Sequence, residues 1–228
     1  MGNFKWDLDL AKKLAAEFTG TAMLMTLGCS IAQFSKSYSE VSLGWGFSYA
    51  AAIHTFAFLS GAHINPWVSV SATIVGVMEW ELMLCYIACQ LLGAFGGFGL
   101  AYVALPENSK HFCTTMAGAN FDEWKIILVE FMLCGFLLFA YCAIWDKRSK
   151  AAYDSYSLRI GFIIAALCFA GHFHGGCSVN FFRSLAPAVV QLEFDGLWAY
   201  FVGQLVAAIL VPVLWRFVIA DEKPEPME

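Results

Sequence analysis

The chain has 228 residues, of which 60% are hydrophobic and 14% are charged, and its formal net charge is −5. Soluble domains are about 45–50% apolar and about one quarter charged, so this composition, with a mean hydropathy of +0.65, argues against a soluble protein. The modest negative charge lies in connections and in the tail, which gives no indication of a nucleic-acid partner.

Six long apolar segments are predicted to span a membrane, and two shorter ones lie between them. In chain order the long segments cover residues 10–34, 43–61, 80–104, 124–145, 157–174 and 196–219. The two short segments, at 65–77 and 180–190, cannot cross a bilayer, and apolar pieces of this length are candidates for re-entrant half-helices. A short polar tail at 220–228 follows the last span.

The basic residues gather before the first span and between the fourth and fifth spans, whereas the connections at 105–123 and 191–195 are more acidic. Short cytoplasmic loops carry an excess of lysine and arginine. We therefore expect a multi-pass protein of a plasma or intracellular membrane with both termini in the cytoplasm.

Two glutamates indicate an internal repeat. Glu17 lies early in the first span, and Asn65 follows it by 48 residues; Glu130 lies early in the fourth span, and Asn180 follows it by 50. Three spans separate the glutamates, so the second copy enters the membrane from the opposite side, as in an inverted repeat. A carboxylate in a membrane needs hydrogen-bond partners, and we expect each glutamate to hold the loop before a half-helix. The sequence thus predicts one transmembrane domain over 1–228, with halves at about 10–104 and 124–219.

The two short segments carry a family resemblance. The first reads SGAHINPWVSV and resembles the SGAHxNPA box of the aquaporin (major intrinsic protein) family, and the second reads GGCSVNFFRSLAPA and resembles its NPARSxxP box. The resemblance extends over nearly the whole chain. It implies an all-α membrane protein with six transmembrane helices and two re-entrant half-helices, and it implies a homotetramer with one pore in each subunit.

The resemblance also implies how the pore works. The amides of Asn65 and Asn180 would donate hydrogen bonds to a passing water oxygen, and His63 matches the family histidine beside the first asparagine. Asparagine is a favoured helix N-cap, and Pro66 suits the first helical position. Two half-helix N-termini that meet at mid-membrane make a locally positive centre, which is a barrier to cations.

A second filter is implied on the extracellular side. Arg183 matches the family arginine, and an ungapped alignment places Trp45, Cys168 and Cys177 at the other three positions of this selectivity constriction. An indole and a small fifth-span residue resemble glycerol facilitators, whereas Ser184 after the arginine resembles the water-selective branch. The constriction therefore predicts a water pore that also admits small neutral solutes such as glycerol or urea.

Three residues depart from the family boxes. Trp67 replaces the alanine of the first box, and Phe181 and Phe182 replace the proline and alanine of the second. Three added rings overpack a close-packed position unless neighbouring side chains shrink. Four small residues are candidates to provide that room: Ala50, Ala51, Ala52 and Gly93.

The sequence therefore predicts a passive channel for water and small neutral solutes that excludes protons and ions. The alternative is a structural or adhesion membrane protein of the same fold whose pore the aromatic residues close. Neither interpretation involves an enzyme, a metal or another cofactor. Six of the eight cysteines, Cys29, Cys85, Cys89, Cys134, Cys142 and Cys168, fall inside apolar segments, where we expect small buried hydrophobes rather than disulfides.

Overall fold

The computed structural model describes residues 6–104, 111–116, 122–172 and 176–220, and these residues form helices and connections without a strand. The α-helices are α1 (Leu8–Phe34), α2 (Tyr38–Ser60), α3 (Pro66–Val75), α4 (Trp80–Ala104), α5 (Glu123–Trp145), α6 (Tyr156–Gly171), α7 (Phe181–Gln191) and α8 (Leu197–Leu214). A 3₁₀ helix, η1 (Lys147–Ser155), precedes α6, and a π-helical segment, η3 (Trp215–Ile219), follows α8. The predicted all-α fold is confirmed.

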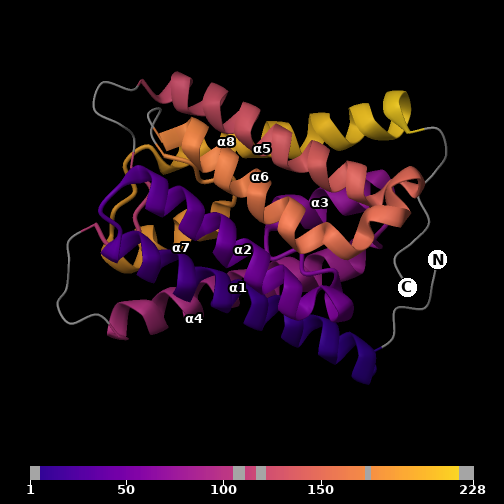
Figure 1. Cartoon of the computed structure of the whole chain (residues 1–228), viewed down its shortest axis with the longest axis horizontal. Helices are drawn as coiled ribbons and strands as arrows, with labels where there is room; N and C mark the ends of the chain where they lie inside the picture. The colour runs from indigo at the N-terminus through magenta and orange to yellow at the C-terminus, as the bar shows by residue number, and fades with distance from the viewer. Residues whose placement is uncertain (1–5, 105–110, 117–121, 173–175, 221–228) are drawn as a thin grey trace.

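The helices form two equivalent sets. In the first half α1 packs on α2 and α4, and in the second half α5 packs on α6 and α8. The long helices run roughly side by side (Figure 1), and the end-on view shows them arranged around the short helices α3 and α7. Each short helix also packs on the last long helix of the other half, α3 on α8 and α7 on α4. The halves are therefore joined through their short helices as well as through α2 and α6.

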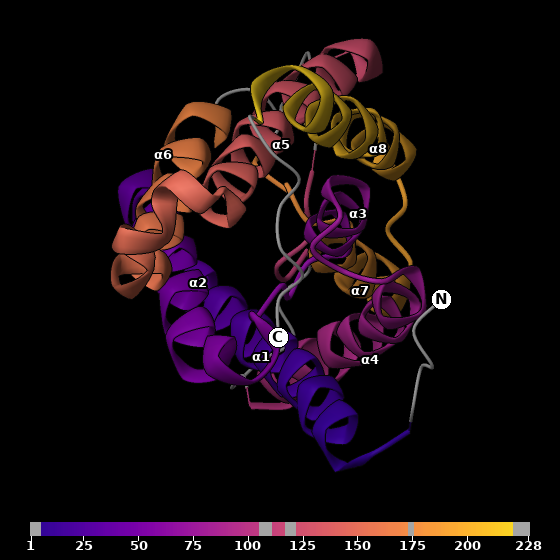
Figure 2. The same ribbon diagram turned by 90° about the vertical axis from the view of Figure 1, so that its right-hand side faces the viewer.

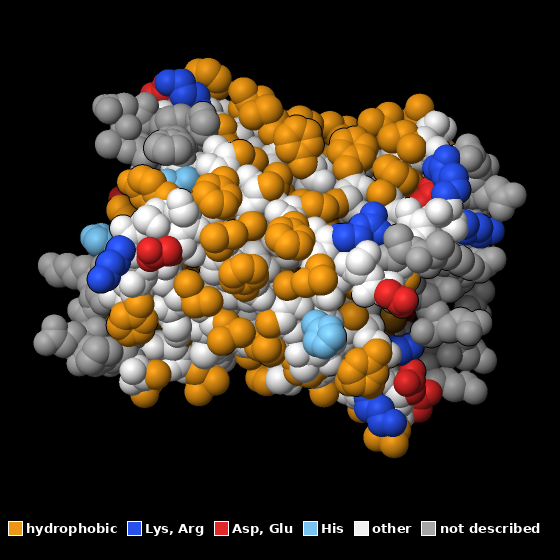
Figure 3. Space-filling model, viewed as in Figure 1, with side chains coloured by type: hydrophobic (Ala, Val, Ile, Leu, Met, Phe, Trp, Pro, Cys, Tyr) orange, Lys and Arg blue, Asp and Glu red, His pale blue; other side chains and the backbone are white. Residues whose placement is uncertain are grey.

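Five of the described helical segments are long and apolar enough to cross a membrane: Leu8–Phe34, Trp80–Ala104, Glu123–Trp145, Tyr153–Gly171 and Leu197–Ile219. Helix α2 is also long, with 23 residues, but several of its polar side chains, among them Ser42 and Ser48, are buried inside the bundle. On the face shown in Figure 3, hydrophobic side chains form a broad band and most charged ones lie toward its two ends. The chain is a multi-pass membrane protein.

Two predicted boundaries are wrong. Helix α2 begins at Tyr38 rather than at residue 43, because the side chain of Ser37 accepts a hydrogen bond from the backbone N–H of Glu40 and caps the helix. Helix α6 ends at Gly171 rather than at residue 174. Residues 173 and 174 of that predicted span lie outside the described residues.

Glycines allow the long helices of each half to approach closely. A Cβ on Gly97 of α4 would collide with the carbonyl of Ala22 on α1, and a Cβ on Gly203 of α8 would collide with the carbonyl of Ile127 on α5. Small residues at helix contacts are a common means of close packing in membranes, where lipid gives no hydrophobic drive for helix association. Each half thus uses a glycine on its last long helix to bring that helix close to its first long helix.

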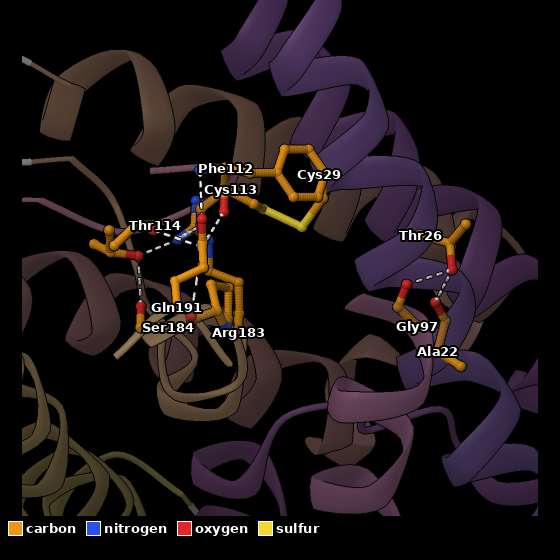
Figure 4. The surroundings of a disulfide bond; sticks show 12 residues. Ala22, Thr26, Cys29, Gly97, Phe112, Cys113, Thr114, Arg183, Ser184 and Gln191 are labelled. Carbon is orange, nitrogen blue, oxygen red and sulfur yellow. Dashed lines mark hydrogen bonds between the residues drawn. A yellow bond between two sulfur atoms is a disulfide. The ribbon is translucent and has the colours of Figure 1, made fainter. Parts of the chain in front are cut away.

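One expectation about the cysteines is wrong. Cys29, near the end of α1, forms a disulfide with Cys113 in the segment at 111–116 (Figure 4). Cys29 is fully buried, as expected for a small hydrophobe, but it lies close to the end of its helix, where a connecting segment reaches it. The other six cysteines are free.

Candidate functional site

The loop before α3 is organised by the buried carboxylate of Glu17. Its Oε1 accepts hydrogen bonds from the hydroxyl of Ser60 (2.7 Å) and the backbone N–H of His63 (2.9 Å). Its Oε2 accepts from the backbone N–H of Ile64 and the side-chain amide of Gln90, each at 2.8 Å. Four donors offset the cost of placing this carboxylate inside the bundle, and they fix the backbone that leads into the half-helix.

The loop before α7 has the same arrangement around Glu130. The backbone N–H of Ser178 donates to Oε1 (2.8 Å), and the backbone N–H of Val179 donates to Oε2 (2.9 Å). The amide of Gln204 on α8 completes the set with a 2.7 Å bond to Oε2. Gln204 therefore corresponds in the second half to Gln90 in the first, a match that the sequence interpretation missed.

The residue before each asparagine has an unusual backbone conformation. Ile64 and Val179 have φ angles of 45° and 46°, in the left-handed region that β-branched residues rarely adopt. This conformation is held by the N–H bonds to the two glutamates, and it presents each carbonyl to the opposite loop. The amide of Asn65 donates to the Val179 carbonyl (2.8 Å), and the amide of Asn180 donates to the Ile64 carbonyl (2.9 Å).

Each asparagine also caps its half-helix. The side-chain oxygen of Asn65 accepts from the N–H of Trp67 (3.0 Å), and that of Asn180 accepts from the N–H of Phe182 (3.2 Å). Pro66 occupies the first turn of α3, where its missing N–H would have no partner within the helix. The N-termini of α3 and α7 consequently meet, and their amide groups point toward the same small region.

The phenol of Tyr49 lies in that region. The amide of Asn180 donates to the Tyr49 oxygen at 3.2 Å. The sequence interpretation did not select Tyr49, although it lies four residues after Trp45 and so on the same face of α2, one turn along. That spacing is the signal that would have identified it.

The aromatic residues of the altered boxes pack against α8. The indole N–H of Trp67 donates a 2.6 Å bond to the side-chain oxygen of Gln204, and the rings of Trp67 and Phe181 lie 5.6 Å and 4.9 Å from that of Phe201. Phe182 is the neighbour of Phe181 at 6.4 Å. Of the small residues expected to provide room, Gly93 does not, because it faces Phe18 and Thr21 on α1.

The structure brings two residues of the predicted constriction into contact. The guanidinium of Arg183 lies 4.6 Å from the ring centre of Trp45, in a cation–π contact, and the Trp45 ring packs against Gly28. Cys177 lies against Gly171 of α6, and the buried Cys168 precedes that glycine by three residues on the same helix.

A segment that the sequence interpretation left out orients Arg183. Its guanidinium donates to the carbonyl of Cys113 (3.4 Å) and to the hydroxyl of Thr115. Thr115 is also within 2.7 Å of the Ser184 hydroxyl, which lies 2.6 Å from that of Ser178. Thr115 and Arg183 are 68 residues apart in the chain, and no pattern in the sequence indicates that they meet.

These hydroxyls form a hydrogen-bonded chain in which every donor points toward Asn180. Ser178 donates to the carbonyl of Asn180 (3.1 Å), so its oxygen accepts from Ser184, and Ser184 in turn accepts from Thr115. Each hydroxyl has one hydrogen. The oxygen of Thr115 is then left to accept from Arg183, and the chain joins the Arg183 guanidinium to the backbone carbonyl of Asn180.

The segment at 111–116 is anchored at both sides of this contact. The Cys29–Cys113 disulfide ties it to α1, and the side chain of Gln191 on α7 exchanges two hydrogen bonds with the backbone of Phe112, at 2.9 Å and 2.7 Å (Figure 4). Gln191 also donates to the Thr114 hydroxyl (3.0 Å). The arm formed by residues 111–116 is thus held from two elements while it contacts Arg183.

His63 lies behind the first loop. It is fully buried, its Nδ1 lies 3.1 Å from the Ser69 hydroxyl, and its ring packs edge-on against Tyr86 at 5.4 Å. These contacts place the imidazole among supporting residues of the first half.

Two half-helices from inverted halves that meet inside a helical bundle define a membrane protein of the channel and transporter class. Residues 5–215 match the model of the major intrinsic protein family, and the chain belongs to that family. It is a channel for water or small solutes, and it is not an enzyme.

The chain is similar to human aquaporin-2, with 32% identity over 223 residues that cover 94% of this chain and 82% of the relative. It is 30% identical over 229 residues to the mouse lens fiber major intrinsic protein, covering 94% and 84% of the two chains. The crystal structure of the aquaglyceroporin from Plasmodium falciparum superposes with a TM-score of 0.82 over 92% of this chain and 97% of that one, at 23% sequence identity. The last comparison shows the fold.

Proposed function

We propose that this protein is a passive channel for water that also admits small neutral solutes such as glycerol or urea. The observation that carries the proposal is the meeting of the two half-helix N-termini. There the amides of Asn65 and Asn180 project into one region, and each is oriented by the carbonyl of the opposite loop.

The exclusion of ions and protons follows from this geometry. The N-terminus of a helix carries about half a positive charge, so the two ends repel a cation that reaches the centre. Amide donors turn the oxygen of a passing water toward themselves and its hydrogens away, which interrupts a proton wire. Arg183, beside Trp45 and bonded to the carbonyl of Cys113, adds a second positive position toward the arm.

The relatives support this range of solutes, because they include aquaporins and the similar solved structure is that of an aquaglyceroporin. We further propose that the functional unit is a homotetramer in a plasma or intracellular membrane, with both termini in the cytoplasm. The Cys29–Cys113 disulfide supports that orientation, because it lies at the opposite end of α1 from the N-terminus, and disulfides persist in oxidising compartments.

The proposal is tested by reconstitution of the purified protein in vesicles. Osmotic shrinkage is followed with an impermeant osmolyte, and swelling is then followed in glycerol and in urea. A matched control is Phe58→Ala, since Phe58 is 81% exposed on the outer face of α2 and its replacement leaves the inner residues untouched. Rates equal to those of empty vesicles for every solute, with an intact oligomer, would contradict the channel and support a structural or adhesion role.

A further inference from the structure

Tyr49 has contacts that a residue lining an open pore would lack. It lies in the middle of α2 on the same side as Trp45, and its phenolic oxygen accepts a hydrogen bond from Asn180. One side chain from the first half therefore contacts the tip of the half-helix of the second half.

The count of amide hydrogens decides what this contact means. A side-chain amide has two hydrogens. Asn180 gives one to the Ile64 carbonyl and the other to Tyr49, and Asn65 gives one to the Val179 carbonyl. Both hydrogens of the Asn180 amide are therefore taken, and neither remains for a permeating molecule.

The burial of the three side chains agrees with that count. Asn65 is 0% exposed, and Asn180 and Tyr49 are each 2% exposed. The phenolic oxygen occupies the position, relative to the Asn180 amide, that the oxygen of a passing water would occupy.

We propose that Tyr49 closes this pore by taking the hydrogen bond that Asn180 would otherwise give to water. The inference rests on the proposed channel function. A molecule crosses the centre only when the phenol has turned away, so Tyr49 sets the rate of conduction, whereas Asn65 and Asn180 set what is conducted.

Three variants test the proposal in reconstituted vesicles. Tyr49→Phe keeps the ring and removes the acceptor, and Tyr49→Val removes the ring as well. Tyr86→Phe is the matched control, because Tyr86 is also buried and its hydroxyl donates a single 3.0 Å bond to the backbone of Ser60, away from the asparagines. Oligomeric state and thermal stability are measured for each, so that a folding defect is recognised.

We expect Tyr49→Phe to raise the water permeability per subunit by about tenfold, because the hydrogen bond that holds the closed arrangement is lost. Tyr49→Val should raise it further, and Tyr86→Phe should equal the wild type. Folded Tyr49 variants that conduct like a conducting wild type, or less well, overturn the role of Tyr49 and leave the channel intact. If the wild type and Tyr49→Val both remain at the level of empty vesicles, the channel function fails and the inference fails with it.

Discussion

The contact between Thr115 and Arg183 gives the sharpest prediction about selectivity. Replacement of Thr115 by valine keeps the shape of the side chain but removes the hydroxyl that accepts from the guanidinium. The remaining contacts of Arg183 are the long bond to the Cys113 carbonyl, at 3.4 Å, and the cation–π contact with Trp45. The arginine should therefore leave its oriented position more often.

The magnitude follows from the kind of bond that is lost. A hydrogen bond to a charged group contributes about 1.5–3 kcal/mol, and about 1.4 kcal/mol corresponds to a tenfold change in an equilibrium. The oriented arrangement should therefore lose about tenfold in population. Because a displaced Arg183 widens the constriction, the ratio of glycerol to water permeability should rise by about the same factor.

The assay is stopped-flow light scattering on the same vesicles, first with an impermeant osmolyte and then with glycerol. Thr115→Ser restores the hydroxyl and should return the ratio to that of the wild type. Thr114→Val is the matched control, because Thr114 belongs to the same arm but its hydroxyl accepts from Gln191 of α7 and not from Arg183. A ratio that does not change in folded Thr115→Val, or that changes equally in Thr114→Val, would refute the reasoning.

The disulfide offers an independent route to the same state. Replacement of Cys29 and Cys113 together by serine releases the arm from α1, and treatment of the wild type with dithiothreitol should have the same effect. In that exchange the reductant forms its cyclic disulfide while the protein gains two thiols. The double variant should show the raised ratio of Thr115→Val and no further response to the reductant.

Three further outcomes can be measured directly. Trp67→Phe leaves the buried oxygen of Gln204 without its donor, so it should lower the free energy of unfolding by about 1–3 kcal/mol, as read from thermal denaturation in detergent. Cys177→Ser should abolish inhibition by mercurials, and inhibition that survives would place this loop away from the path. The hydrogen bond with His111 lowers the pKa of Glu193, so the carboxylate stabilises the fold above its ordinary pKa of 4.5 and loses this effect as the pH falls through the lowered value. The difference in melting temperature between the wild type and His111→Ala should therefore be larger at pH 6 than at pH 3.

The sequence was sufficient for the order and type of the membrane segments. Long apolar blocks identify spans by length alone, and α1, α4, α5 and α8 lie where they were predicted. Helix α2 was predicted too short because its first turn, from Tyr38, is polar and depends on the cap at Ser37 rather than on apolar residues. Apolar length is a poor guide where a cap determines the end.

The contacts that orient the site could not be predicted in this way. Cys113 lies 84 residues from Cys29, and Thr115 lies 68 residues from Arg183, each in a polar connection without a periodic pattern. Nothing in such a segment shows which buried group it reaches. Only the fold brings the arm over α7, where Gln191 receives it.

Gln204 explains how the two altered boxes are accommodated. In the first half Gln90 divides its amide between Glu17 and the Ser69 hydroxyl, and its side-chain oxygen has no hydrogen-bond partner among the described residues.

In the second half the equivalent oxygen, that of Gln204, accepts from the indole of Trp67. A tryptophan in the first box therefore meets an acceptor that the second half supplies, and the ring of Phe201 beside it covers both Trp67 and Phe181. Trp67 and Phe181 thus pack on α8, whereas Tyr49, which bonds Asn180, belongs to α2. The aromatic residues therefore enlarge the packing between the halves, and the closing contact that we propose is made by a different side chain.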